Sequence, residues 1–152
     1  RVGMGIVLRC PQQRNIGQGG IINIWIRPQK GWNIEDAQRE GNLDLAILVG
    51  FRLSRRHKMR LRLITTLHDE SETKEALYYL HEIIDVARLP ERTDVQTVQG
   101  NLFESVSKAP KAAVNIFGLP NPYQQDFVDQ LLTLSQDACL FVKSSGNESV
   151  LV

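Results

Sequence analysis

The chain has 152 residues, 42% of them hydrophobic and 23% charged, which is typical of one globular domain. Its 18 basic and 17 acidic side chains nearly cancel, which excludes a global electrostatic attraction to nucleic acid. The longest apolar stretch, residues 43–51, falls far short of the ~20 residues that cross a bilayer. Cys10 and Cys139 form no CxxC pair and favour a reducing compartment, and the first residue, Arg1, favours a fragment of a longer protein.

The N-terminal part is predicted to divide at residue 20. Residues 1–20 should supply one strand, at 5–9, and a polar loop, and residues 21–152 should form an α/β domain. Residues 21–27 are apolar and β-branched enough for a buried strand. A helix is expected over 43–57, and the alternation of residues 59–66 indicates a strand with one wetter side.

The clearest helix is predicted over residues 70–89. Its apolar residues recur at spacings of three and four and define one buried stripe: Ala76, Leu77, Leu80, Ile83, Ile84 and Ala87. Pro90 should end this helix, and His68-Asp69-Glu70-Ser71 offers capping groups at its start.

Three more strands are expected over 93–98, 112–117 and 138–142, with short helices over 102–108 and 123–135. This alternation predicts a three-layer α/β/α sandwich with a mainly parallel five-stranded sheet. Right-handed crossovers, with the alternating 93–98 strand at an edge, favour the order third, second, first, fourth, fifth. The fifth strand would be the other edge and is too apolar to stay bare, so the tail 149–152 or another chain should cover it.

No residue pattern predicts catalysis, a metal or a cofactor. The glycine cluster at 17–20 precedes a strand, whereas phosphate-binding loops lie between a strand and a helix. His68, Asp69 and Glu70 could suggest a metal site, but adjacent residues rarely converge on one ion and capping explains the acids. Because no G-x-S-x-G elbow with a base is found either, we expect the chain not to be an enzyme.

The helix at 43–57 carries the candidate contact residues. It is apolar nearly all the way round, which predicts cover on two sides by a neighbouring subdomain or a second copy of the chain. The residues expected at this interface are Leu45, Leu48, Val49, Phe51 and Arg52.

A basic run follows on the same helix, formed by Arg52, Arg55, Arg56, His57, Lys58, Arg60 and Arg62. One interpretation is structural, because cations near a helix C-terminus complement its dipole and the others flank a strand. The other is contact with anionic lipid headgroups or an acidic partner surface, with Arg55, Arg56 and Lys58 as the contact residues.

Several segments together resemble the C-terminal cytosolic domain of cation–chloride cotransporters. Ile22-Asn23-Ile24-Trp25-Ile26 is similar to the Ile-Asp-Val-Trp-Trp strand of that family, and the helix from Asn42 to Val49 resembles its leucine-rich helix. Glu82 to Leu89 resembles the family's segment in which a helix ends at Arg-Leu, and Ala113 to Pro120 resembles its strand that ends in Leu-Pro. Cys139 to Leu151 resembles the closing segment of the family's domain. The matches keep their order over most of the chain. The strand has one tryptophan, Trp25, followed by Ile26 where the family has a second tryptophan, and there is no long insertion near Gly100. These departures indicate a compact, prokaryotic-type member.

The resemblance implies a regulatory and assembly domain on the cytoplasmic side of the membrane. Its partners would be its own transmembrane domain, which would carry out the symport of chloride with a cation such as potassium, and a second copy in a homodimer. The implied fold is like that of universal stress proteins, some of which bind ATP at a glycine-rich turn after the fourth strand. Here that turn reads Gly118-Leu119-Pro120-Asn121-Pro122, whose prolines lack amide donors, so we expect no such nucleotide site. The alternative is a stand-alone nucleotide-sensing module of the same fold.

Overall fold

The central strand of the sheet is β2 (Ile21–Ile26), in a computed structural model that describes residues 5–9, 20–39 and 42–144. β2 pairs in parallel with β3 (Arg60–Leu67) on one side and with β5 (Val114–Gly118) on the other. Its side chains from 22 to 26 are all buried. A strand covered on both faces has this continuous apolar pattern, so the sequence correctly indicated a central position.

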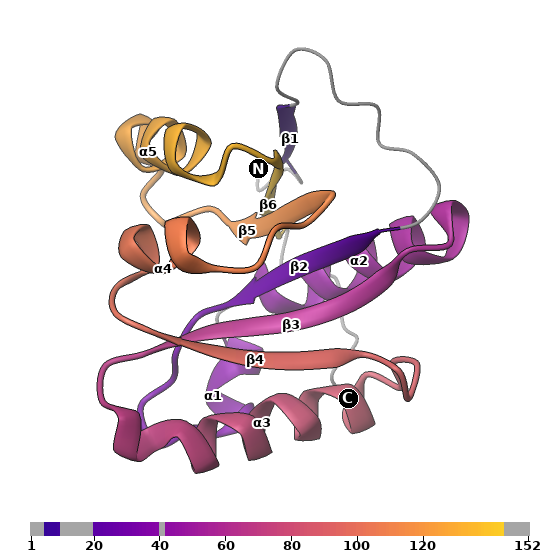
Figure 1. Ribbon diagram of the computed structural model, residues 1–152, viewed down its shortest axis with the longest axis vertical. Coiled ribbons are helices and arrows are strands. Elements are labelled where there is room, and N and C mark those ends of the chain that lie inside the picture. The colour runs from indigo at the N-terminus through magenta and orange to yellow at the C-terminus, as the bar shows by residue number, and fades with distance from the viewer. Residues whose placement is uncertain (1–4, 10–19, 40–41, 145–152) are drawn as a thin grey trace.

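Six strands form one sheet in the order β1-β6-β5-β2-β3-β4, with β4 (Asp94–Gln99) at one edge (Figure 1). The strands from β2 to β6 run parallel to one another. Their order is the one predicted from right-handed crossovers, and the predicted fold class is confirmed.

β1 (Gly5–Arg9) covers the edge of β6 (Ala138–Lys143). The two strands are antiparallel, with Gly5 opposite Lys143 and Arg9 opposite Cys139. The expectation that β6 lies at the edge is therefore wrong, because β1 supplies the cover that its apolar sequence requires. The tail 149–152 lies outside the described residues.

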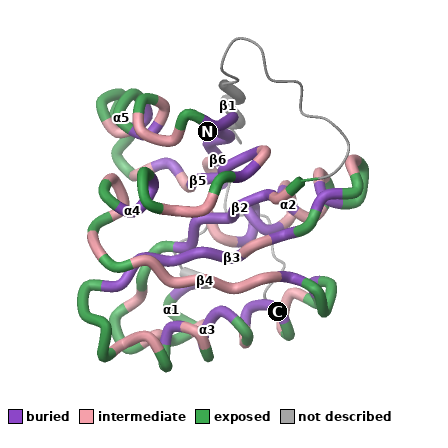
Figure 2. Tube along the Cα trace, in the orientation of Figure 1, coloured by how far each residue is buried: buried purple, intermediate pink, exposed green. Residues whose placement is uncertain are grey.

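Helices cover both faces of the sheet and complete the three layers (Figure 1). One face carries α2 (Asn42–His57), α3 (Thr73–Val86) and the short α1 (Ile34–Arg39). The other carries α4 (Leu102–Lys108) and α5 (Gln125–Ser135). Figure 2 shows the buried residues gathered on the central strands, with exposed residues on the outer sides of the helices. The sequence prediction missed α1, because its six residues are too few to show a helical stripe.

The side chains of β2 alternate between two cores. Ile22, Ile24 and Ile26 pack with the α2 and α3 side, whereas Trp25 points to the α4 and α5 side. There Trp25 stacks on Phe117 with ring centroids 5.7 Å apart, and Phe117 stacks on Phe141 at 5.6 Å. These three stacked rings form a continuous aromatic layer across β2, β5 and β6 on this side of the sheet.

The helix predicted over 70–89 consists of a 3-10 turn, η1 (Glu70–Glu72), followed by α3. It ends at Val86, earlier than predicted. Arg88 has a φ of 53°, and the amide of Leu89 donates to the carbonyl of Ile84 at 3.0 Å. This left-handed turn ends the helix before Pro90 is reached.

Candidate functional site

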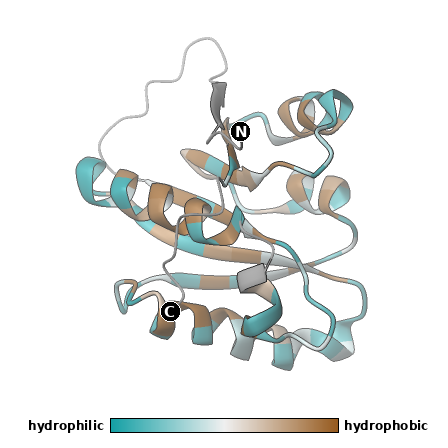
Figure 3. Cartoon of the chain, turned by 180° about the vertical axis from the view of Figure 1, so that it is seen from behind, coloured by the Kyte–Doolittle hydropathy of each residue, from teal (hydrophilic) through white to brown (hydrophobic). Residues whose placement is uncertain are grey.

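The outer face of α2 consists of Leu48, Phe51, Arg52 and Arg55, which share one side of the helix at spacings of three and four residues. Leu48 and Phe51 are half-buried, and both arginines are exposed. The Arg55 guanidinium carbon lies 5.7 Å from the centroid of the Phe51 ring, within the range of a cation–π contact. The helix is seen from this side in Figure 3, where apolar turns give way to a polar end.

The predicted interface residues of α2 divide between the core and the surface. Leu45 is only 2% exposed and belongs to the core, so a surface role for it must be dropped. Val49 and Phe51 are half-buried and pack partly against that core. Within the described part of the chain, Leu48 is half-buried yet belongs to neither hydrophobic cluster.

The C-terminal end of α2 and the residue after it carry most of the basic run, Arg52 to Lys58. Arg55, Arg56 and His57 occupy the last turn, where positive charge complements the helix dipole. Lys58 follows with a φ of 53° and is exposed, as is Arg56. Neither Lys58 nor Arg56 has a hydrogen-bond or ion-pair partner among the residues that the structure describes.

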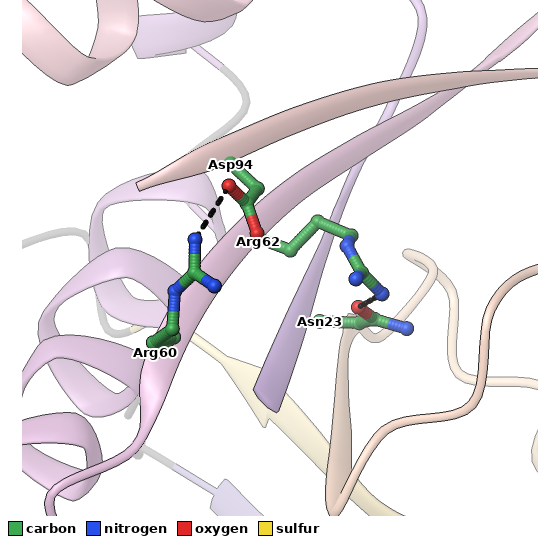
Figure 4. A network of polar contacts seen from close by, with 4 residues as sticks. All are labelled: Asn23, Arg60, Arg62 and Asp94. Atoms are coloured by element: carbon green, nitrogen blue, oxygen red, sulfur yellow. Dashed lines mark hydrogen bonds and ion pairs between the residues drawn. The ribbon is translucent and has the colours of Figure 1, made fainter. Parts of the chain in front are cut away.

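The last two residues of the run, Arg60 and Arg62, are engaged in the sheet. Arg60 forms an ion pair with Asp94 of β4 at 2.9 Å, and Arg62 donates to the side-chain oxygen of Asn23 at 3.3 Å (Figure 4). The Arg60–Asp94 pair is exposed and contributes at most about 1 kcal/mol. For these two arginines the structural interpretation is sufficient, and the candidate contact surface narrows to α2 and Lys58.

Asp69 caps the start of η1, as the sequence indicated. Its carboxylate accepts from the amide of Ser71 at 2.8 Å, and Glu72 accepts from the amide of Asp69 at 3.3 Å, which completes a capping box. The Ser71 amide lowers the pKa of Asp69 below its ordinary 3.8. Over residues 5–9, 20–39 and 42–144, no group of three His, Cys, Asp or Glu side chains has the arrangement of a metal site.

A cavity of about 780 Å³ opens at the carboxyl ends of the parallel strands. It is lined where β2 ends at Ile26, by Thr66 of β3, and where β5 ends at Phe117 and Gly118. The strand order reverses between β2 and β5, and in doubly wound sheets ligands bind at this switch point. The sequence analysis missed the cavity, because its wall residues come from segments far apart in the chain.

The turn after β5 is shaped by packing. A Cβ atom on Gly118 would lie 3.1 Å from the Cβ of Asn42, a tight contact, so glycine eases the close approach of α2 here. The Asn42 side chain donates to the carbonyl of Leu119 at 2.8 Å and accepts from the amide of Ser144 at 2.9 Å. Asn42 thus joins the start of α2 to the ends of β5 and β6.

The fold and its cavity define the class of this protein, a doubly wound α/β domain with a space at the topological switch point. A family model described as "Prokaryotic cation-chloride cotransporter, C-terminal domain, 2nd" matches residues 17–151. The chain therefore belongs to this family, and the resemblance noted in the sequence is confirmed. No curated protein matches the chain.

A solved structure agrees with this assignment. The chain is 28% identical to a protein whose structure is titled "Crystal structure of the cytoplasmic domain of a prokaryotic cation chloride cotransporter", with a TM-score of 0.84. The match covers 97% of the present chain but 55% of that one. The present chain thus corresponds to little more than half of the solved domain. None of the helices in the described ranges has the length and apolarity to cross a membrane.

Proposed function

We propose that this chain is a non-catalytic regulatory and assembly domain of a cation–chloride cotransporter, on the cytoplasmic side of the membrane. It pairs with a second copy through the outer face of α2 and couples that pairing to the membrane-embedded part, which moves the ions. The family match supports the attachment to a transporter. The pairing rests on a feature of the chain itself.

The partial exposure of Leu48 is the observation that best supports the pairing. It is apolar, half-buried and outside both cores of the domain, beside the exposed Arg52. Single exposed apolar residues are common, but here Phe51 and its bound Arg55 extend the surface along the same side of the helix. Aromatic and arginine side chains are enriched at the centre of protein interfaces, and Phe51 with Arg55 supplies such a pair beside Leu48.

Replacement of Leu48 by Asp tests this pairing. In a two-fold symmetric dimer each side chain occurs twice, so a loss of about 1.4 kcal/mol per copy weakens association roughly a hundredfold. We expect sedimentation equilibrium to show a monomer–dimer equilibrium for the parent chain and a shift of Leu48→Asp to monomer. Circular dichroism should be unchanged, because Leu48 lies outside the cores.

The matched control is Tyr78→Asp. Tyr78 is 74% exposed on α3, so the same charge is introduced at an exposed apolar residue of another helix. This variant should associate like the parent. A parent that stays monomeric at every concentration, or a Leu48→Asp variant that dimerises as well as the parent, would contradict the assignment of this surface.

The basic end of α2 is proposed to contact anionic lipid headgroups. Arg55, Arg56 and Lys58 are exposed, and each basic residue near an anionic membrane contributes about 1 kcal/mol. The double change Arg56→Gln and Lys58→Gln, which leaves the pairing surface intact, should weaken sedimentation with phosphatidylserine vesicles roughly thirtyfold at low salt. Changing Lys108 and Lys111 to Gln removes equal charge near α4, and this control should bind like the parent. Equal losses in both double variants would point to general charge attraction instead.

A further inference from the structure

The cavity at the strand ends has the size and position of a ligand site, and it is independent of the pairing surface. Its volume of about 780 Å³ falls within the ~300–1,000 Å³ of small-molecule pockets. We propose that it binds a small, planar, uncharged aromatic compound of about two fused rings with one hydrogen-bonding group.

The aromatic walls indicate a planar ligand. Trp25 and Phe117 line the cavity as a stacked pair, with an interplanar angle of 17°. Trp32 and Tyr79 line it as a tilted pair, with centroids 5.7 Å apart. The first pair projects from β2 and β5, and the second comes from the segment before α1 and from α3. Aromatic faces and edges gain most from another flat ring, which buries a large area in this space.

Thr66 offers a polar group to the ligand. Thr66 is only 6% exposed and lines the cavity, yet its hydroxyl has no hydrogen-bond partner in the described ranges. Two other polar groups of the wall are engaged: Glu72 accepts from the indole nitrogen of Trp32 at 3.0 Å, and Asn101 accepts from the amide of Glu104 at 3.0 Å. Thr66 is not among the described residues whose polar atoms are sealed without a partner, so its hydroxyl keeps some exposed surface at which a ligand donor or acceptor would bond.

The charges of the wall argue against a phosphorylated ligand. The wall contains one arginine, Arg27, and one carboxylate, Glu72, so cationic groups do not accumulate as they do around polyphosphates. Gly118 packs closely against Asn42, and Pro120 has no amide hydrogen to offer an anion. These features favour an uncharged ligand.

The test uses the fact that both tryptophans of the 152-residue chain line the cavity. Labelling with 5-fluorotryptophan gives two fluorine NMR signals, which a Trp32→Phe variant assigns. Three compounds share one skeleton: 2-naphthol is planar and neutral, decahydro-2-naphthol is not planar, and 2-naphthyl phosphate is charged. ATP serves as the nucleotide probe. We expect 2-naphthol to shift both signals saturably at concentrations up to about 1 mM, and the other three to bind at least about tenfold more weakly.

Thr66→Val tests the polar contact. This change removes the hydroxyl at nearly constant volume and should weaken the binding of 2-naphthol about two- to tenfold. Thr66→Ser keeps a hydroxyl and should bind like the parent, as should Thr97→Val on β4, which lies outside the cavity. The proposal is overturned if 2-naphthol moves neither signal, if 2-naphthyl phosphate, ATP or the saturated alcohol binds as tightly, or if Thr66→Val binds 2-naphthol unchanged.

Discussion

Asn115 accepts two hydrogen bonds in the middle of the sheet. Its side-chain oxygen lies 2.9 Å from the indole nitrogen of Trp25 and 3.1 Å from the side-chain nitrogen of Asn23, its neighbour in the parallel register. Asn23 also donates to the carbonyl of Pro110 at 3.2 Å. Asn23 is fully buried and Asn115 is 3% exposed, so these bonds replace water that cannot reach them.

Asn115→Ala should therefore destabilise the domain by about 2–4 kcal/mol, because it leaves the Trp25 donor buried without a partner and opens a small space. Urea denaturation followed by circular dichroism measures this change. Asn121→Ala alters an exposed asparagine and should stay within about 0.5 kcal/mol of the parent. If both variants unfold at the same urea concentration, Asn115 is not the acceptor on which this part of the sheet depends.

At the scale of the element, Gly50 determines how closely α2 approaches the sheet. A Cβ atom at this position would lie 2.6 Å from the Cδ1 of Ile24 and 3.3 Å from the Cδ1 of Ile116. Both isoleucines are fully buried, so they have little room to move. The apolar sequence of α2 was interpreted as a helix covered on two sides, and its close fit on β2 and β5 at Gly50 was not foreseen.

Gly50→Ala should destabilise the domain by about 1 kcal/mol, although alanine is the better helix former, because the clash outweighs the propensity. Ile24→Val removes the clashing Cδ1 atom and alone should cost about 1 kcal/mol. In the double variant the two losses should be less than additive, with a coupling of at least about 0.5 kcal/mol in a urea double-mutant cycle. Strict additivity would mean that the helix shifts away from β2 to make room.

Helices and strands could be predicted where their own residues carry a clear pattern of apolar positions. β2 and β5 have continuous apolar sequences that mark central strands, and α4 was predicted with the bounds that it has, 102–108. α1 was missed because six residues with two apolar positions do not establish a helical period.

At the scale of the whole molecule, the strand order followed from general rules, because right-handed crossovers leave few arrangements of five parallel strands. The pairing of β1 with β6 did not follow. It joins residues 5–9 to residues 139–143, which lie far apart in the sequence, and no local pattern specifies a partner at such a separation. The cavity was missed for the same reason, since Trp32, Thr66 and Phe117 meet only after the sheet is assembled.

The antiparallel register of β1 and β6 also determines how this domain responds to force. Gly5 pairs with Lys143, so the first residue of β1 and the last residue of β6 lie at the same end of the ladder. Tension that separates these two residues therefore opens the ladder like a zipper, one hydrogen-bonded pair after another, and does not load all the pairs at once in shear. Because β6 is also held by β5, β1 is the strand that peels away first.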